Sequence, residues 1–143
     1  MPGKNAEILH RWFEEVWNHR DLTVIDELMS EECLSHGLMD DKGNVRRGPE
    51  GFRLLFHAFT GAYPDMNVTI EETVTQEDKV VVRCVVRGTH TGSGIGVAPT
   101  GNKVEFTGLC IARIADGKII ESWNQYDFMK MYGQLGVLSL TLG

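Results

Sequence analysis

One carboxylate, that of Asp127, comes directly after the last predicted strand. This strand covers residues 118–126 and follows the turn sequence Asp116-Gly117. An Asp-Gly pair between two apolar runs predicts a hairpin. Because side chains alternate between the faces of a strand, Asp127 and Trp123 should share one face. Also on that face are Glu121 and Gln125, and on the other are Ser122, Asn124 and Tyr126. A carboxylate near a large aromatic side chain is typical of a proton-transfer site in an apolar pocket.

The same residue could instead begin a helix. Asp127 precedes Phe128, Met131, Tyr132 and Leu135, which recur at helical spacing. Aspartate is a favoured helix N-cap, because its carboxylate accepts hydrogen bonds from free backbone N–H groups. The local pattern therefore leaves catalyst and cap as alternatives.

Two histidines are further candidates for proton chemistry, because an imidazole titrates near neutral pH. His90 could donate to a substrate carbonyl or relay a proton, or it could bond the glycine-rich loop at residues 92–101. His36 could project into a pocket from a short extended stretch, or lie partly exposed on it. No histidine pair has the H-x-x-x-H spacing of a zinc site, so the sequence predicts no metal.

Several aromatic side chains could line a pocket. The candidates are Trp12, Phe56, Phe59 and Trp123. Large aromatic side chains are usually buried, so a place in the hydrophobic core is the simplest explanation of Trp12, Phe56 and Phe59.

The predicted elements are three N-terminal helices followed by strands. Helices are expected over residues 6–18, 22–29 and 48–62, an extended stretch over 33–39, a turn over 40–44, and strands over 66–76, 79–91, 104–114 and 118–126. This order predicts an α+β fold with helices on one face of a curved antiparallel sheet. Glycines inside the strands, at Gly88, Gly92 and Gly108, predict that the sheet bends around a cavity.

Composition narrows the class of protein. A chain of 143 residues predicts a single domain over residues 1–143. The net charge of −6 opposes binding to nucleic acid. Three cysteines without C-x-x-C pairing indicate reduced core residues, and neither a signal peptide nor a membrane-spanning run is present, so the sequence predicts a soluble cytoplasmic protein.

Six motifs in order resemble the SnoaL-like polyketide cyclases, also called ester cyclases, of the nuclear transport factor two-like superfamily. They are Trp17-Asn18-x-x-Asp21, Tyr63-Pro64-Asp65, Gly88-Thr-His-Thr-Gly92 with Ala98-Pro-Thr-Gly101, Asp116-Gly-Lys-Ile119, Glu121-x-Trp123-x-x-x-Asp127 and Gln134-Leu-Gly136. The resemblance covers nearly the whole chain. It implies a cone-shaped half-barrel with the three N-terminal helices packed on the concave face of the sheet.

The resemblance also implies a reaction, an intramolecular aldol ring closure of a polyketide methyl ester without metal or organic cofactor. Asp127 stands at the position of the family's acid/base, and Arg113 is the nearest candidate for a polar partner on the preceding strand. The substrate would be an apolar carbonyl compound, and the open face of such a sheet commonly pairs with a second copy. The alternatives are a binding module without chemistry and a dimeric scaffold of the same fold.

Overall fold

The computed structural model describes residues 3–38, 40 and 42–138. Residues 39 and 41, in the predicted extended stretch and turn, lie outside this description. The helices are α1 (Lys4–Arg11), the π-helix η1 (Trp12–Asn18), α2 (Thr23–Leu28), α3 (Gly48–Ala62) and α4 (Phe128–Gln134). The strands are β1 (Met29–His36), β2 (Arg46–Arg47), β3 (Asn67–Gln76), β4 (Lys79–Thr89), β5 (Lys103–Ala115) and β6 (Lys118–Tyr126).

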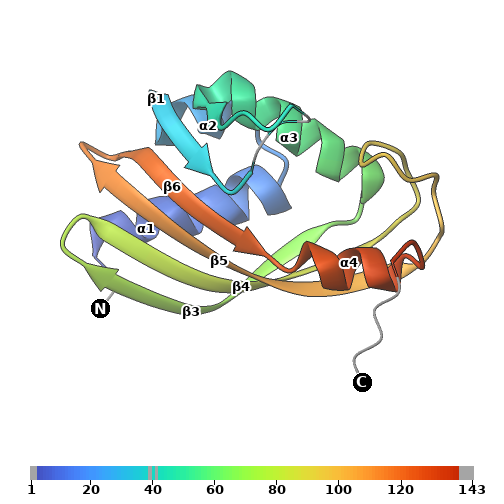
Figure 1. Cartoon of the computed structure of the whole chain (residues 1–143). Helices are drawn as coiled ribbons and strands as arrows, with labels where there is room; N and C mark the ends of the chain where they lie inside the picture. The colour runs from blue at the N-terminus through green and yellow to red at the C-terminus, as the bar shows by residue number, and fades with distance from the viewer. Residues whose placement is uncertain (1–2, 39, 41, 139–143) are drawn as a thin grey trace.

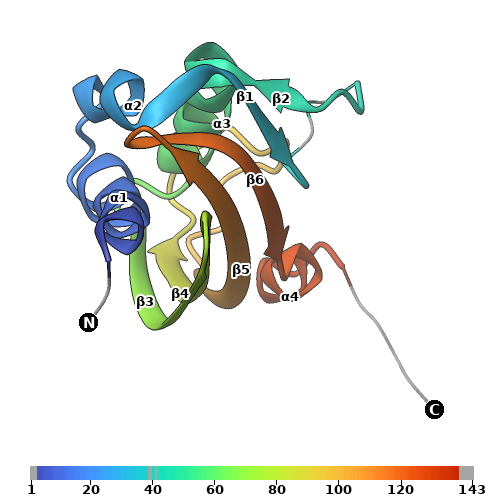
Figure 2. The same ribbon diagram turned by 90° about the vertical axis from the view of Figure 1, so that its left-hand side faces the viewer.

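The strands form one curved sheet in the order β2-β1-β6-β5-β4-β3. The long strands β3 to β6 follow one another as antiparallel hairpin partners. Register shifts between Ile70 and Glu72 and between Arg113 and Ile114 bend the sheet, because a bulge increases the local twist. Figures 1 and 2 show the long strands curling around the helices, so that the sheet has an inner and an outer face.

Helix α1 continues directly into η1, and together they cross the inner face of the sheet (Figures 1 and 2). Trp12, Phe13, Val16 and Trp17 are all buried in η1. In the wider π-helical turn, residues i and i+5 bond, which brings four large side chains within seven residues to the same side. The first predicted helix, over residues 6–18, is therefore one segment with two helical geometries.

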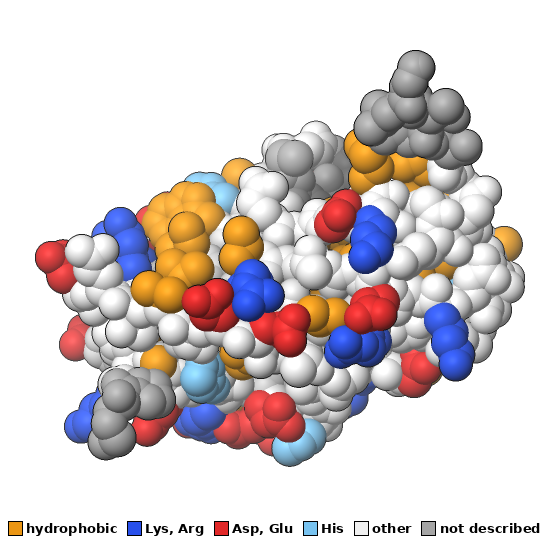
Figure 3. Space-filling view, turned by 90° about the horizontal axis from the view of Figure 1, so that it is seen from below, with side chains coloured by type: hydrophobic (Ala, Val, Ile, Leu, Met, Phe, Trp, Pro, Cys, Tyr) orange, Lys and Arg blue, Asp and Glu red, His pale blue; other side chains and the backbone are white. Residues whose placement is uncertain are grey.

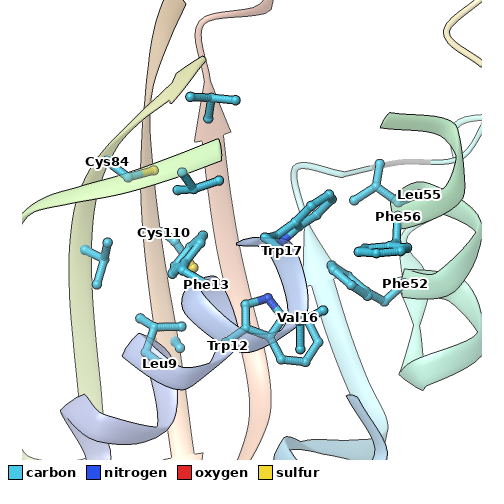
Figure 4. Close-up of a cluster of buried hydrophobic side chains, with 14 of the residues drawn as sticks. Leu9, Trp12, Phe13, Val16, Trp17, Phe52, Leu55, Phe56, Cys84 and Cys110 are labelled. Carbon is cyan, nitrogen blue, oxygen red and sulfur yellow. The ribbon is translucent and has the colours of Figure 1, made fainter. Parts of the chain in front are cut away.

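Helix α3 begins and ends where local chemistry requires it. Pro49 lies in the first turn, where the missing N–H costs no hydrogen bond. The helix ends at Ala62, two residues before Pro64, because the residue before a proline avoids helical geometry. Its apolar side, which includes buried Phe52 and Phe56, faces η1, and Figure 4 shows these rings beside Trp17.

The predicted α+β cone is confirmed, with two differences in detail. The third predicted helix, α3, follows β1 and β2 along the chain. The sheet also contains one parallel pair, β1 with β6, in which His36 lies beside Trp123. No turn joins these two strands, so their direction is set by packing against α2 and α3 rather than by a hairpin.

Alternation along the strands separates the two faces of the sheet. On β4, Val80, Val82, Cys84 and Val86 are buried, as predicted for one face. On β6, the inner side chains are Ser122 and Asn124, which are buried, with Tyr126 next in line. None of the helices in the described part of the chain combines the length and apolarity needed to span a bilayer.

Candidate functional site

Two adjoining cavities lie between the helices and the inner face of the sheet. The outer cavity has a volume of about 40 Å³ and the inner one about 30 Å³. They share the walls made by Trp17, Leu38 and Tyr126. A single buried water needs roughly 10–15 Å³ of such cavity volume. A polycyclic ligand is much larger than a water, so it fits only after the side chains between the two cavities move.

Aromatic and aliphatic side chains line the outer cavity. Besides the shared walls, it is lined by Leu55, Phe59, Met66, Val68, Val86, Phe106 and Phe128. Phe128, the first residue of α4, has its ring centroid 5.7 Å from that of Phe59 and 5.9 Å from that of Tyr126. Such surroundings bind flat apolar molecules, because rings stack favourably at these distances.

Three polar residues line the inner cavity: Ser35, Ser122 and Asn124. We call these three residues the floor. These residues are only 3%, 7% and 8% exposed. Ser35 of β1 lies beside Ser122 in the parallel register, and Asn124 follows on the same face of β6. Asn124 Nδ2 donates to His36 O at 3.0 Å and to Ser122 Oγ at 3.1 Å. The floor thus places neutral hydrogen-bonding groups at the end of an apolar cavity.

Tyr126 forms the wall between the two cavities. Burial raises the pKa of its hydroxyl well above the ordinary value, so it stays protonated near neutral pH. Opposite it on β5 stands Gly108, where a Cβ would lie 2.3 Å from the Tyr126 ring. The absent side chain of Gly108 makes the space that the ring occupies.

The four aromatic residues predicted to line a pocket lie in different parts of the structure. Trp12 lines the inner cavity and Phe59 lines the outer one. Phe56 is buried behind them, 5.3 Å from Trp17 between ring centroids, and packs the wall rather than lining a cavity. Trp123 is half-buried on the outer face of the sheet, and its ring stacks on His36 at 5.5 Å.

His36 and Arg113 also meet on the outer face, at Glu121. The Glu121 carboxylate contacts His36 Nε2 at 2.7 Å and accepts a hydrogen bond from an Arg113 guanidinium nitrogen at 2.6 Å. These two hydrogen bonds, that of His36 first, hold the pKa of Glu121 below its usual value. The cluster is an ion-paired patch on the opposite side of the sheet from the cavities.

His90 lies at the end of β4 and is fully buried. The Thr100 N–H donates to its Nδ1 at 3.2 Å, and the His90 carbonyl accepts from the Gly101 N–H at 2.7 Å. Nδ1 is therefore an acceptor, and the neutral ring carries its proton on Nε2. His90 therefore binds the far end of the loop that connects β4 to β5, through Thr100 and Gly101.

Asp127 caps α4. Its carboxylate accepts a hydrogen bond from the Lys130 N–H at 3.0 Å, and its own N–H donates to Thr107 O at 3.0 Å. The residue is exposed and borders open surface hollows, while its neighbours Tyr126 and Phe128 line the cavities. This geometry is that of a helix N-cap, one of the two alternatives that the sequence offered for Asp127. A catalytic role for Asp127 stays a prediction.

The sequence patterns did not single out the floor. Ser35, Ser122 and Asn124 are small polar residues whose types carry no catalytic signature. The alternation along β6 does place Ser122 and Asn124 on the opposite face from Trp123 and Asp127. The large aromatic side chain and the carboxylate, however, predicted a site on the face of Trp123 and Asp127. Within the described residues, no three His, Cys, Asp or Glu side chains lie close enough to hold a metal ion.

Fold and cavity together define a class, the cone-shaped α+β proteins that enclose an apolar site inside a curved sheet. Within it, this chain belongs to the SnoaL-like polyketide cyclase family, whose sequence profile matches residues 7–135.

Individual relatives agree with this assignment. The aklanonic acid methyl ester cyclase DauD of Streptomyces sp. strain C5 is 28% identical over 130 residues, covering 90% of this chain and 80% of the relative. DnrD of Streptomyces peucetius, with the same name, is 28% identical over 90% of this chain and 88% of its own. The crystal structure of wild-type IdmH from Streptomyces antibioticus matches with a TM-score of 0.82 and 33% identity, covering 94% of this chain and 100% of the other.

Proposed function

We propose that this protein closes a ring in a polyketide-like carbonyl compound bound in the cavities inside the cone. The observation that carries the proposal is an aromatic-lined cavity that ends on a neutral polar floor. Curated relatives named as aklanonic acid methyl ester cyclases support the reaction class. The sequence-based expectation of an apolar carbonyl substrate suits walls of this composition.

The reaction would be an intramolecular aldol addition. A carbon next to one carbonyl loses a proton and forms a C–C bond with the carbon of a second carbonyl, whose oxygen gains a proton. Substrate and product are isomers of equal mass. The fold contributes by holding the two reacting carbons together, since a well-oriented intramolecular reaction gains an effective concentration of about 10⁵ M or more.

The test is incubation of the purified protein with aklanonic acid methyl ester, followed by chromatography and mass spectrometry. The proposal expects a new isomer of unchanged mass, formed faster than in protein-free buffer. Absence of any such isomer, with the compound also failing to bind, would overturn the proposal.

A second candidate function is a binding module with the same cavity. It is favoured by one observation: within the described residues, the side chains lining the two cavities include no Asp, Glu, His, Lys or Arg. The described cavity lining therefore supplies no such side chain as a base for proton removal, whereas binding alone needs none. Tight binding of aklanonic acid methyl ester without conversion would select this candidate.

Asp127→Asn separates the two readings of Asp127, because asparagine caps a helix about as well as aspartate but has no charge. Proton transfer by Asp127 would make this variant roughly a hundredfold slower. The role predicted from the sequence expects this slow variant, whereas turnover within about threefold of wild type would assign Asp127 to the cap alone. The control is Asp127→Ala, which loses the cap and about 1 kcal/mol of stability in urea unfolding.

We also propose a homodimer formed through the outer face of the sheet. A cross-strand row of Val74, Val81, Ile111, Trp123 and His36 crosses this face. Val74 is 54% exposed and Ile111 is 36% exposed. Figure 3 shows the molecule from below, with orange apolar side chains gathered beside red and blue ones.

The occupant we propose is a second copy, because the charges beside the row are already paired. Arg83 with Glu72, Arg87 with Glu105 and Arg113 with Glu121 neutralise one another. A chain with a net charge of −6 would otherwise repel its copy, whereas a neutral apolar row can face itself across a two-fold axis.

Ile111→Glu is expected to convert the dimer into a monomer, because it places two like charges near the axis of the pair. Light scattering coupled to size exclusion measures the mass. Leu54→Glu on α3, 69% exposed and outside the cross-strand row, is the control and should leave the dimer intact. A monomeric wild type at about 100 μM, far above a micromolar dissociation constant, would contradict the proposal.

A cytoplasmic location is the last part of the proposal. Cys33, Cys84 and Cys110 are buried and free. Burial raises the pKa of their thiols to about 11, 11 and 12, so they stay protonated near neutral pH. Unpaired cysteines are usual in reducing compartments. Retention of the protein in the cytoplasmic fraction after osmotic shock is expected, and its release with periplasmic proteins would argue against this location.

A further inference from the structure

The floor contains a hydrogen-bond acceptor that the protein leaves without a donor. Both hydrogens of Asn124 Nδ2 are used, one toward His36 O and one toward Ser122 Oγ. A backbone carbonyl can only accept, so the contact with His36 O fixes which end of the amide is the nitrogen. Oδ1 must therefore point the other way.

The carbonyl end of Asn124 is not fully enclosed, and the residue lines the inner cavity. Within the described part of the chain, Oδ1 receives no hydrogen bond, and it is not one of the fully enclosed atoms without a partner. Asn124 itself is 8% exposed and lines the inner cavity. An acceptor held in an otherwise apolar cavity favours a ligand that brings a donor, because leaving it unpaired costs free energy.

Ser122 completes the arrangement. Its Oγ accepts from Asn124 Nδ2 at 3.1 Å, and its hydroxyl hydrogen makes no hydrogen bond to another described residue. The floor thus presents an acceptor, Asn124 Oδ1, beside a possible donor, the Ser122 hydroxyl. An enolised β-dicarbonyl carries the matching pair, an O–H next to a C=O, and a phenol carries the O–H alone.

The floor also discriminates by charge. None of the described residues that line the inner cavity is cationic, so a carboxylate or enolate arriving there would be buried without a counter-charge. Burial of an unpaired charge is far more costly than burial of a neutral hydroxyl. The ligand end that reaches Asn124 must therefore be uncharged.

From these observations we propose that Asn124 is a specificity-determining residue that accepts a hydrogen bond from a neutral enol or phenol hydroxyl of the substrate. The inference rests on the proposed function, since it takes the cavities as the substrate site. It adds the chemical group by which the substrate is oriented, with its hydroxyl end on the floor and its apolar rings toward Phe59 and Phe128.

Equilibrium binding of three small probes tests this without any turnover. The probes are 2-naphthol, 2-methoxynaphthalene and naphthalene, compared by isothermal titration calorimetry. Wild type should bind 2-naphthol about tenfold more tightly than either of the others, the effect of one neutral hydrogen bond. The ether is larger and the hydrocarbon smaller than the naphthol, so neither a steady gain nor a steady loss of affinity with size gives a preference over both.

Asn124→Leu, which keeps the branching at Cγ but has no polar atoms, should reduce this preference to about twofold or less while still binding naphthalene. Gln125→Leu, on the outer side of the same strand, is the matched control and should keep the tenfold preference. Equal affinities for the three probes in wild type would overturn the proposal even if Asn124→Leu does not fold. An undiminished preference in a folded Asn124→Leu would overturn it as well.

The outcome is separable from that of the proposed function. A protein that prefers 2-naphthol through Asn124 but converts no methyl ester has the predicted floor without the predicted reaction. A protein that closes the ring but binds the three probes equally has the reaction without this recognition.

Discussion

Gly37→Ala is expected to lower the free energy of unfolding by about 3–5 kcal/mol, among the largest losses that one substitution causes. Gly37 follows β1 with φ at +85°, and a Cβ there would lie 2.0 Å from the backbone oxygen of Asn124. A backbone atom in a paired strand cannot move aside as a flexible side chain can. The methyl group would therefore force β1 away from β6, at the pair that holds the floor.

The control for Gly37→Ala is Gly43→Ala. Gly43 has nearly the same φ, +84°, but a Cβ there meets no atom of the described residues within 4 Å. This variant isolates the cost of the left-handed backbone, about 1–2 kcal/mol. Urea unfolding curves measure both variants. Equal losses at the two positions would show that the close approach of Gly37 to Asn124 contributes nothing.

Gly108→Ala is expected to block the cavities. A Cβ at Gly108 would lie 2.3 Å from two ring carbons of Tyr126, so the ring must leave its place on the wall. The side of the ring away from β5 is the cavity, and the displaced ring would fill it. We expect 2-naphthol affinity to fall at least about thirtyfold and stability to fall by about 1–3 kcal/mol from overpacking.

A double variant checks this cause. Tyr126→Leu removes the ring, so Gly108→Ala combined with it should recover much of the stability that Gly108→Ala loses alone. Such a coupling is expected only between residues in contact. Additive effects of the two substitutions, measured by urea unfolding and calorimetry, would mean that Gly108 does not act through Tyr126.

The fold was largely predictable from the sequence because its signals are local. Helical spacing of Phe52, Leu55 and Phe56 and the Asp116-Gly117 turn each determine an element without knowledge of the rest. The parallel pairing of β1 with β6 was not predictable, since no turn links the two strands. The π-helical turn at Trp12 was also missed, because apolar spacing alone does not distinguish it from an α-helix.

The site was harder to predict, for a physical reason. Alternation on β6 divides Asn124 from Trp123, but it does not say which face turns inward. Trp123 has the larger apolar surface, yet His36 stacks on it from the neighbouring strand and half-buries it on the outer face. Asn124 is buried with its amide nitrogen satisfied by His36 O and Ser122, and the contact with His36 O exists only once β1 lies beside β6.

We propose that this protein binds its substrate in the interior of the cone, between Phe128 and Asn124. A crystal structure of the protein with 2-naphthol tests it most directly. The naphthyl rings are expected among Trp17, Phe59 and Phe128, with the hydroxyl within hydrogen-bond distance of Asn124 Oδ1. Density only on the outer face beside Trp123, or in the surface hollow beside Asp127, would contradict it.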